Sequence, residues 1–305
     1  MRVRQWVAFD AVGKTLMPRR DGHIKISVTQ VAVEGTGAIL LTGPSSCGKG
    51  EIANGLCRFL SMPPQLHVSM GELLRSTVQA ARGDASFRER LGSQYGISDT
   101  VPILTAASST QDLIEKVKRN EAIFGNRFKR HLGVLSQLDW LEYCVLEGLL
   151  IPDDWTERII DARLRDSTDL RDGIFILDGY PRTVEAAQRL LSTFAELDIG
   201  VIKVIHLSIT KDQMKTRAGG RGRPDDTNDI LERRYQFYVE HVQPCIDYLK
   251  AELGTNHVAL VDAHQPVFLA AGGLDLERSI RAVTSSVLEA LGLPRFLLDL
   301  DEPVG

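Results

Sequence analysis

The sequence lacks the features that would direct its interpretation towards secreted or nucleic-acid-binding proteins. It has only four cysteines among 305 residues, and no two of them form a C-x-x-C pair. That spacing fits neither a structural zinc site nor a disulfide framework. The formal net charge is −4, so the chain has no overall excess of basic residues with which to hold nucleic acid. We therefore expect any phosphate chemistry to depend on local clusters of cations.

Long apolar stretches are also missing. Nowhere do about 18 apolar residues follow one another without interruption, as a membrane-spanning helix requires. The basic residues at the N-terminus are not followed by the apolar run of a secretory signal. These absences predict a reduced, cytoplasmic setting and no membrane partner. Hydrophobic residues still make up 43% of the chain and charged residues 25%, which is typical of a globular protein with a sizeable core.

Strand and helix patterns alternate along most of the chain. Two segments rich in β-branched residues, 3–9 and 24–33, flank a Pro-Arg-Arg-Asp-Gly turn signal and predict a β-hairpin-like extension over residues 1–37. From Ala38 a buried strand (AILLT), a glycine-rich loop (GPSSCGKG) and a helix (EIANGLCRFL) follow one another. Further apolar runs at 174–177, 201–207 and 258–261 alternate with helical stretches at 154–165 and 228–250. This order predicts an α/β fold with a parallel sheet covered by helices on both faces.

Residues 84–137 differ from the rest of this region. Their polarity is mixed, a helix is expected around 110–120, and no buried-strand run occurs among them. We interpret them as a helical insertion that packs on the surrounding domain, which extends over residues 38–292. The tail 293–305 is short and bounded by prolines.

The loop that begins at Gly43 fits the pattern G-x-x-x-x-G-K, placed between a buried strand and a helix. Glycines let successive backbone N–H groups face one concavity, the helix presents its positive end, and Lys49 can reach terminal phosphates. The alternative is an ordinary glycine-rich turn, but the lysine stands at the required offset. The residues predicted to contact ATP phosphates are Gly43, Ser45, Ser46, Cys47, Gly48, Lys49, Gly50 and Glu51. No Ser or Thr follows the lysine, so magnesium must be held in another way.

Further stretches make the chain resemble the adenylate kinase and UMP/CMP kinase family of nucleoside monophosphate kinases. They are HVSMGELLR at 67–75, GLLIPDD at 148–154, LDGYPRT at 177–183, and RAGGRGRPDD followed by ILERR at 217–234. The last resembles the short lid of eukaryotic-type members. The resemblance runs in consistent order from about residue 38 to 264.

This resemblance implies a P-loop NTPase-like parallel sheet, an enlarged monophosphate-binding region at 67–152, a short lid at about 217–226, and a monomer. It also implies transfer of the terminal phosphoryl group of Mg-ATP to a nucleoside monophosphate, with AMP expected first. The catalytic residues it implies are Lys49, Arg182, Arg217, Arg223, Arg234 and Asp178, the last reaching Mg²⁺ through water and no residue binding the metal directly. Those implied for the monophosphate are Met70, Arg75, Leu150, Ile151, Gly179 and Arg182. Arginine suits these roles because its planar fork matches phosphate oxygens.

Several positions depart from the family pattern. Glu51 replaces a threonine beside the phosphate loop, and Gln213 replaces an arginine that stacks on the donor adenine in many members. Met70 replaces a small residue, and Ala186 replaces the glutamine that reads adenine, with the nearby Gln188 as an alternative reader. A UMP/CMP kinase and a catalytically weak P-loop sensor therefore stay open as alternatives. In the lid, Asp225 and Asp226 suit hinge salt bridges and catalysis equally.

Overall fold

The computed structural model describes residues 8–18, 24–106, 109–221 and 227–293 of the chain. The chain divides into two compact units: unit 1 comprises Met1–Ser69 and Ser167–Gly305, and unit 2 comprises Met70–Asp166. Within the described residues, no helix combines the length and apolar character needed to cross a bilayer.

Unit 1 is built on a parallel sheet, which confirms the predicted α/β fold class. The strands lie in the order β4 (His67–Ser69), β5 (Ile174–Asp178), β3 (Gly37–Thr42), β6 (Val201–Ser208) and β7 (Val258–Asp262). All neighbouring strands pair in parallel. The apolar runs predicted as strands are β3, β5, β6 and β7, whereas β4 was missed because three residues are too few to show a pattern.

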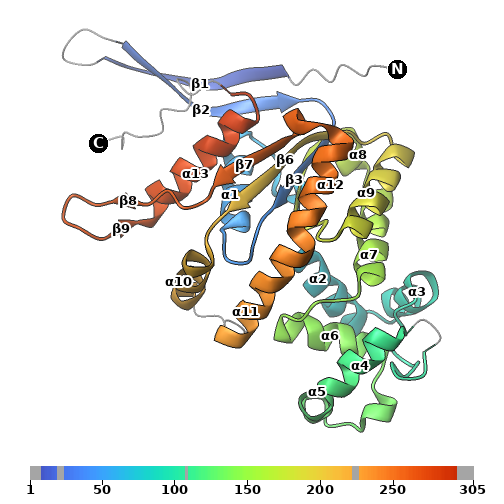
Figure 1. Cartoon of the computed structure of the whole chain (residues 1–305). Coiled ribbons are helices and arrows are strands. Elements are labelled where there is room, and N and C mark those ends of the chain that lie inside the picture. The colour runs from blue at the N-terminus through green and yellow to red at the C-terminus, as the bar shows by residue number, and fades with distance from the viewer. Residues whose placement is uncertain (1–7, 19–23, 107–108, 222–226, 294–305) are drawn as a thin grey trace. The chain divides into compact units, whose positions relative to one another are not determined.

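Helices cover both faces of this sheet (Figure 1). On one face, α1 (Lys49–Phe59) packs against α13 (Leu276–Ala290). The other face is covered by α9 (Val184–Glu196) and α12 (Gln243–Leu253), which contact each other. Phe175 of β5 points to this second face, because its ring packs edge-on against Phe194 of α9 with the ring centroids 6.1 Å apart. Coverage on both sides explains why β3 and β5 are buried along their whole length and read as continuous apolar runs.

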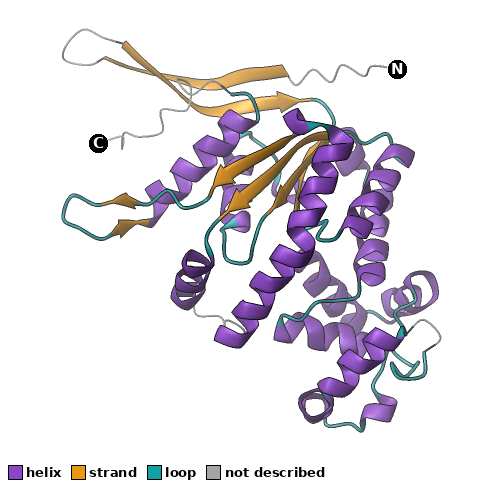
Figure 2. Cartoon of the chain, in the orientation of Figure 1, coloured by secondary structure: helices purple, strands orange, loops and turns teal. Residues whose placement is uncertain are grey.

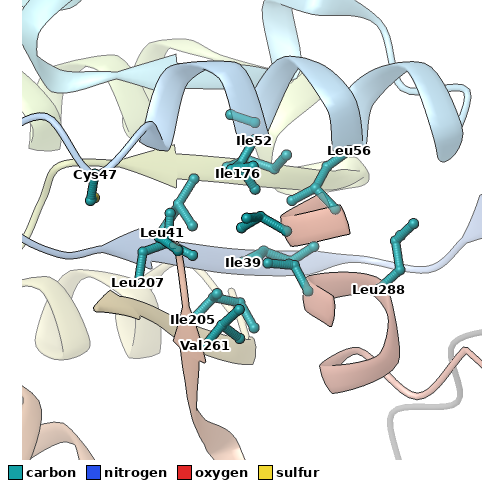
Figure 3. Close-up of a cluster of buried hydrophobic side chains, with 14 of the residues drawn as sticks. Ile39, Leu41, Cys47, Ile52, Leu56, Ile176, Ile205, Leu207, Val261 and Leu288 are labelled. Atoms are coloured by element: carbon teal, nitrogen blue, oxygen red, sulfur yellow. The ribbon is translucent and has the colours of Figure 1, made fainter. Parts of the chain in front are cut away.

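On the face covered by α1 and α13, alternate residues of each strand point into the core, because successive side chains of a strand point to opposite faces of the sheet. Figure 3 shows β3, β5, β6 and β7 directing aliphatic side chains towards those of α1 and α13. The labelled residues are Ile39, Leu41, Cys47, Ile52, Leu56, Ile176, Ile205, Leu207, Val261 and Leu288. Burying each such aliphatic side chain contributes about 1.5–3 kcal/mol. This packing fixes α1, and therefore the loop that precedes it, against the central strand.

The N-terminal extension consists of β1 (Ala8–Pro18) and β2 (Ile24–Glu34), which pair antiparallel with Ala8 opposite Glu34 and Pro18 opposite Ile24. The first strand therefore lies later than the predicted 3–9, of which residues 3–7 are outside the described residues. Short connections are strongly favoured in hairpins, so the strand that pairs with β2 has to end shortly before it begins. Residues 19–23 between the two strands are also outside the described residues.

Unit 2 is helical. Its helices are α2 (Met70–Gly83), α3 (Ala85–Tyr95), α4 (Gln111–Arg119), α5 (Glu121–Phe128), α6 (Gln137–Glu147) and α7 (Asp153–Asp166), with a 3₁₀ turn η2 (Leu132–Val134). The helix expected around 110–120 is α4, whose N-cap is Thr110. The predicted insertion thus supplies α3, α4 and α5 to a unit that also includes α2, α6 and α7 (Figure 2).

Aromatic packing ties the insertion to the rest of unit 2. The Phe124 ring of α5 lies 5.1 Å from Trp140 and 5.0 Å from Tyr143 of α6, measured between centroids. All three residues are fully buried. Within the insertion, Asp84 is the N-cap of α3, and its carboxylate accepts hydrogen bonds from the amides of Ser86 and Phe87. In the described residues, the segment predicted as an insertion contributes α3, α4 and α5 to this packing.

The remaining elements belong to unit 1. They are α8 (Thr168–Asp172), α10 (Lys211–Arg221), α11 (Asn228–Phe237), the π-helix η3 (Tyr238–Val242), the short hairpin β8 (Val267–Phe268) and β9 (Leu274–Asp275), and the 3₁₀ turns η1 (Pro64–Leu66) and η4 (Thr255–His257). The glycine-containing lid expected from residue 217 begins as helix, because α10 continues to Arg221. The rest of it, residues 222–226 with Arg223, Asp225 and Asp226, lies outside the described residues, as does the tail from residue 294.

Candidate active site

The phosphate loop connects the end of β3 at Thr42 to the start of α1 at Lys49. Its backbone bends sharply: φ is 145° at Gly43 and 93° at Gly48, in the region that favours glycine. A Cβ atom at Gly43 would lie 2.4 Å from the Leu207 carbonyl oxygen, so only glycine lets the loop pass β6. The loop therefore has the shape that the sequence predicts for a phosphate cradle at a helix N-terminus.

Two side chains of the loop have polar groups facing this cradle. The Lys49 ammonium donates to the carbonyl oxygens of Gly43 (3.0 Å) and Pro44 (2.9 Å). These bonds hold the charge over the loop, and the same donors can pass to phosphate oxygens when a nucleotide binds. The buried Ser46 hydroxyl has no hydrogen-bond partner among the described residues, which leaves it available to a ligand.

The neighbouring strand β5 brings a carboxylate and an arginine to the same edge of the sheet. Asp178 is the last residue of β5 and pairs with Leu41 of β3, and the Gly179 amide donates to the Leu41 carbonyl at 3.0 Å. Arg182 folds back so that its Nε donates to the Gly179 carbonyl at 2.7 Å. Because carboxyl ends of parallel strands meet at one edge, the motif at 177–183 lies beside the phosphate loop.

Asp178 fits a magnesium ion that is bound through water. The residue is only 7% exposed, yet its Oδ1 has no hydrogen-bond partner among the described residues. A buried carboxylate oxygen left unpaired is costly unless a ligand, ion or water completes it. In the part of the chain that the structure describes, no group of three or more His, Cys, Asp or Glu side chains could hold a metal. This donor set suits Mg²⁺ that keeps its waters and is held chiefly by substrate phosphates.

Arg217 connects α10 to the phosphate loop. Its Nη1 donates to the Cys47 carbonyl at 3.3 Å, and its Nη2 donates to the Ala263 carbonyl at 2.6 Å. This arginine is therefore at the loop, as the sequence predicts, but the helix and not a loop carries it. Arg234 is half-buried on α11. Unit 1 thus places Lys49, Asp178, Arg182 and Arg217 at or beside the phosphate loop.

Comparison with known proteins assigns this arrangement to a family. Residues 107–253 match the family model described as "Adenylate kinase". The chain is 33% identical over 157 residues to the adenylate kinase of Mycolicibacterium smegmatis, a match that covers 51% of this chain and 86% of that protein. The chain belongs to the adenylate kinase family. Matches to the adenylate kinases of Mycobacterium sp. (strain MCS) and Mycobacterium marinum are each 29% identical over 217 residues, and cover 71% of this chain and 88% of each relative.

As a member of the adenylate kinase family, the protein is a phosphotransferase. The family match at 107–253 includes Asp178, Arg182, Arg217 and Arg234. The phosphate loop precedes that span, so its geometry is independent support for nucleotide binding. Among the described residues, this adenylate kinase family member also has a histidine that the sequence prediction did not assign. The Nε2 atom of His67 lies 3.6 Å from Oδ2 of Asp178. His67 is the first residue of the family-like stretch 67–75, and its place in that stretch could have identified it from the sequence.

Unit 2 of this adenylate kinase family member contains four of the residues predicted to bind the monophosphate. Met70 is buried at the start of α2, and Arg75 is exposed on the same helix. Leu150 is 45% exposed in the segment between α6 and α7, and Ile151 beside it is half-buried. The other two, Gly179 and Arg182, belong to unit 1.

The substituted glutamine Gln213 has a structural explanation. Its Oε1 accepts from the Thr210 amide at 2.8 Å, while the Thr210 hydroxyl accepts from the Gln213 amide at 3.2 Å. This reciprocal pair is a capping box, which satisfies two amides at the start of α10. The stretch Thr-Lys-Asp-Gln is the sequence signature of that motif. In this adenylate kinase family member, position 213 therefore serves the helix start.

The helix α9 separates the two side chains considered as adenine readers. Ala186 is buried, and its amide donates a hydrogen bond to the hydroxyl of the N-cap Thr183 at 3.2 Å. Gln188 is exposed. Two residues along a helix correspond to a rotation of about 200°, so Gln188 faces away from the direction of Ala186. Gln188 is thus poorly placed to act in place of the missing glutamine.

A buried histidine next to the phosphate-loop strand makes stability depend on pH. Burial, and to a smaller extent the Lys49 charge, lower the pKa of His206 to about 4, and Asp247 opposes them. The unfolded imidazole titrates near 6.5, so the stabilisation is complete above that pH and is lost as the pH falls towards 4. The loss amounts to about 3 kcal/mol at most, because one pKa unit corresponds to ~1.4 kcal/mol.

Urea denaturation of the wild type and His206→Gln at pH 7, 6, 5 and 4 tests this prediction. The glutamine variant cannot take up the proton, so the difference in unfolding free energy between the two proteins should change in the variant's favour by up to about 3 kcal/mol on acidification. If the unfolding free energies of the two proteins changed with pH in parallel, His206 would have the same pKa in the folded and the unfolded state, and the prediction would be wrong.

Proposed function

We propose that this protein transfers the terminal phosphoryl group of Mg-ATP to a nucleoside monophosphate, with AMP as its best acceptor. The observation that carries the proposal is that Asp178 ends β5 in register with Leu41 of β3, the strand that leads into the phosphate loop with Lys49, while Arg182 folds back onto Gly179. Phosphoryl transfer needs cations fixed around the transferred group and little covalent chemistry from the protein. The phosphoryl group can therefore pass directly from ATP to the acceptor, without a covalent intermediate on a protein side chain.

The residues of unit 1 divide the work of binding the donor. The amides of the loop and of the first turn of α1 bind phosphate oxygens, and Lys49 neutralises the charge that develops on the terminal ones. Asp178 would hold a Mg²⁺ ion through its waters, and that ion would supply positive charge to the phosphates of ATP. Arg182, Arg217 and Arg234 add guanidinium groups, whose forked donors match phosphate geometry. Arg223 and the lid at about 217–226 belong to this proposal through the family pattern alone.

Unit 2 supplies the acceptor-binding residues in this proposal. Arg75 contacts the acceptor phosphate, while Met70, Leu150 and Ile151 form an apolar surface for the base. Ala186 has no polar side-chain atom, and Met70 offers only a weak thioether acceptor. Without a polar reader, the base is selected by shape, and an apolar site separates substrates by about 1–3 kcal/mol per methylene-sized difference. We therefore expect discrimination between bases to be weak.

The test is kcat/KM with Mg-ATP and each of AMP, CMP, UMP, GMP and their deoxy forms under one set of conditions. AMP should rank first, with the other bases lower by about 10- to 200-fold. CMP or UMP in first place would support the UMP/CMP kinase alternative, which Ala186 favours. A preference of several orders of magnitude would require a polar reader that has not been identified. Turnover with none of them, despite ATP binding, would favour a P-loop sensor.

A further inference from the structure

A π-turn interrupts the long helix that follows α10. The helix runs from α11 through η3 to α12, and its backbone stays helical at Phe237, Tyr238, Val242 and Gln243. We call residues 238–242 the π-turn. Pro244, which follows it, explains its position: proline has no N–H to donate, and its ring would collide with the carbonyl four residues earlier in a regular helix. The wider π spacing relieves that collision.

The π-turn changes which face of α11 is turned to the sheet. It accommodates one more residue per turn than an α-helix, because its hydrogen bonds run from i to i+5. A regular helix continued backwards from α12 would therefore present a face of α11 that differs by about one residue, or 100°. π-turns of this kind occur frequently at functional sites.

Tyr238, the first residue of the π-turn, is fixed against β6. It is 6% exposed, and its hydroxyl lies 2.8 Å from Nε2 of His206, with the two rings within 6° of parallel. Burial raises the pKa of Tyr238 and lowers that of His206, so both groups are neutral at pH 7. The two neutral groups share one hydrogen bond, whose donor is set by the tautomer of His206. His206 pairs in register with Thr42, the residue immediately before the phosphate loop.

Arg234 lies four residues before Tyr238 on the same face of α11. Leu231, three residues earlier still, is 2% exposed and belongs to the core of unit 1. The half-buried arginine therefore lies in an otherwise buried stripe, one helical turn, about 5.4 Å, beyond Tyr238. The helix returns antiparallel to the strands before it enters β7, so this displacement is towards their carboxyl ends and the phosphate loop (Figure 1).

We propose that the hydrogen bond between Tyr238 and His206 fixes the rotation of α11 and thereby positions the Arg234 guanidinium at the phosphate loop. Tyr238 and His206 are positioning residues in this inference, which rests on the proposed function for the role of Arg234. The hydrogen bond itself does not touch the substrate. It affects the reaction by fixing the rotation of α11, which the π-turn sets, and so the position of Arg234.

A double-mutant cycle on the full chain tests the inference. Tyr238→Phe should lower kcat about three- to tenfold, the worth of one hydrogen bond. In an Arg234→Met background the same change should alter kcat by less than about twofold, because the group that it positions is gone. His206→Leu should reproduce Tyr238→Phe, whereas His206→Gln keeps an acceptor and should retain most activity. Tyr248→Phe, downstream of the π-turn on α12, is the matched control and should leave kcat unchanged.

Binding of a non-hydrolysable ATP analogue, measured by calorimetry, separates this inference from the proposed function. Tyr238→Phe should weaken that binding in the wild type but not in Arg234→Met. Equal effects in the two backgrounds, or a lower Tm with kcat and analogue affinity unchanged, would overturn the positioning role. Absence of phosphoryl transfer in the wild type would overturn the proposed function, and the coupling in analogue affinity would still decide whether Tyr238 acts through Arg234.

Discussion

Replacing Lys49 with methionine is expected to lower kcat by about 10²–10³-fold, the usual cost of removing one preorganised charge-stabilising donor from a transition state. Methionine retains an unbranched stem but removes the ammonium that now donates to Gly43 and Pro44 of the loop. Arg182→Ala is expected to have a comparable effect, because its guanidinium lies at the end of β5 beside the same loop. Initial rates with saturating Mg-ATP and AMP measure both.

Thermal unfolding of these variants shows whether the loss is chemical. Both side chains are polar and reach the surface, so Tm should change little. Lys203→Met is a suitable control, because this lysine of β6 donates to the Asn256 carbonyl at 2.6 Å at an exposed position. It should retain wild-type kcat. Activity within a few-fold of wild type in Lys49→Met would mean that the loop does not act on the transferred phosphoryl group.

Phe124→Ala is expected to destabilise unit 2 by about 3–5 kcal/mol, the range found for large aromatic residues removed from a core. Phe124 is fully buried, and its ring packs against Phe128, Trp140 and Tyr143 at centroid separations of 5.0–5.5 Å. Truncation leaves a cavity between α5 and α6, and it removes an aromatic contact by which the insertion joins this unit. Hydrogen exchange of α5 and α6 amides in the full chain gives the loss directly.

Its neighbour on the same helix provides the control. Ile123 is 60% exposed, so Ile123→Ala should change the unfolding free energy by no more than about 0.5 kcal/mol. The two substituted residues are neighbours on the same helix, and they differ in how far their side chains are buried. Equal, small effects would show that residues 84–137 behave as a surface loop and contribute nothing to the packing of unit 2.

Local patterns in the sequence predicted the elements that depend on local chemistry. Continuous apolar runs gave β3 and β5, because both faces of these strands are covered. The phosphate loop was predictable because its lysine and glycines have fixed offsets. Most motif residues of unit 1 followed from this, since strand ends in a parallel sheet meet at one edge. Asp178 lies beside the loop for that reason, whereas Arg217 reaches the loop from helix α10.

Features that depend on long-range pairing could not be read in this way. The three-residue strand β4 exists because β5 offers a free edge, and it is β4 that brings His67 to Asp178. The positioning role inferred for Tyr238 depends on its contact with His206, a residue more than thirty positions earlier. β1 was misplaced because alternation alone does not show where a strand finds its partner. The capping box at Gln213 could have been predicted from the local sequence Thr-Lys-Asp-Gln. It was missed because Gln213 was considered only as the replacement of an arginine in the family pattern.

The position of β3 in the middle of its sheet has a consequence for synthesis of the protein. Both neighbours of β3, the strands β5 and β6, begin only at Ile174 and Val201, after the whole of unit 2 has been translated. Domains generally fold as units in the order in which they leave the ribosome. Unit 2 has its own buried core and local helical contacts, so it is able to fold while β3 still waits for a partner. The phosphate loop that β3 carries is then among the last parts of the enzyme to acquire its shape.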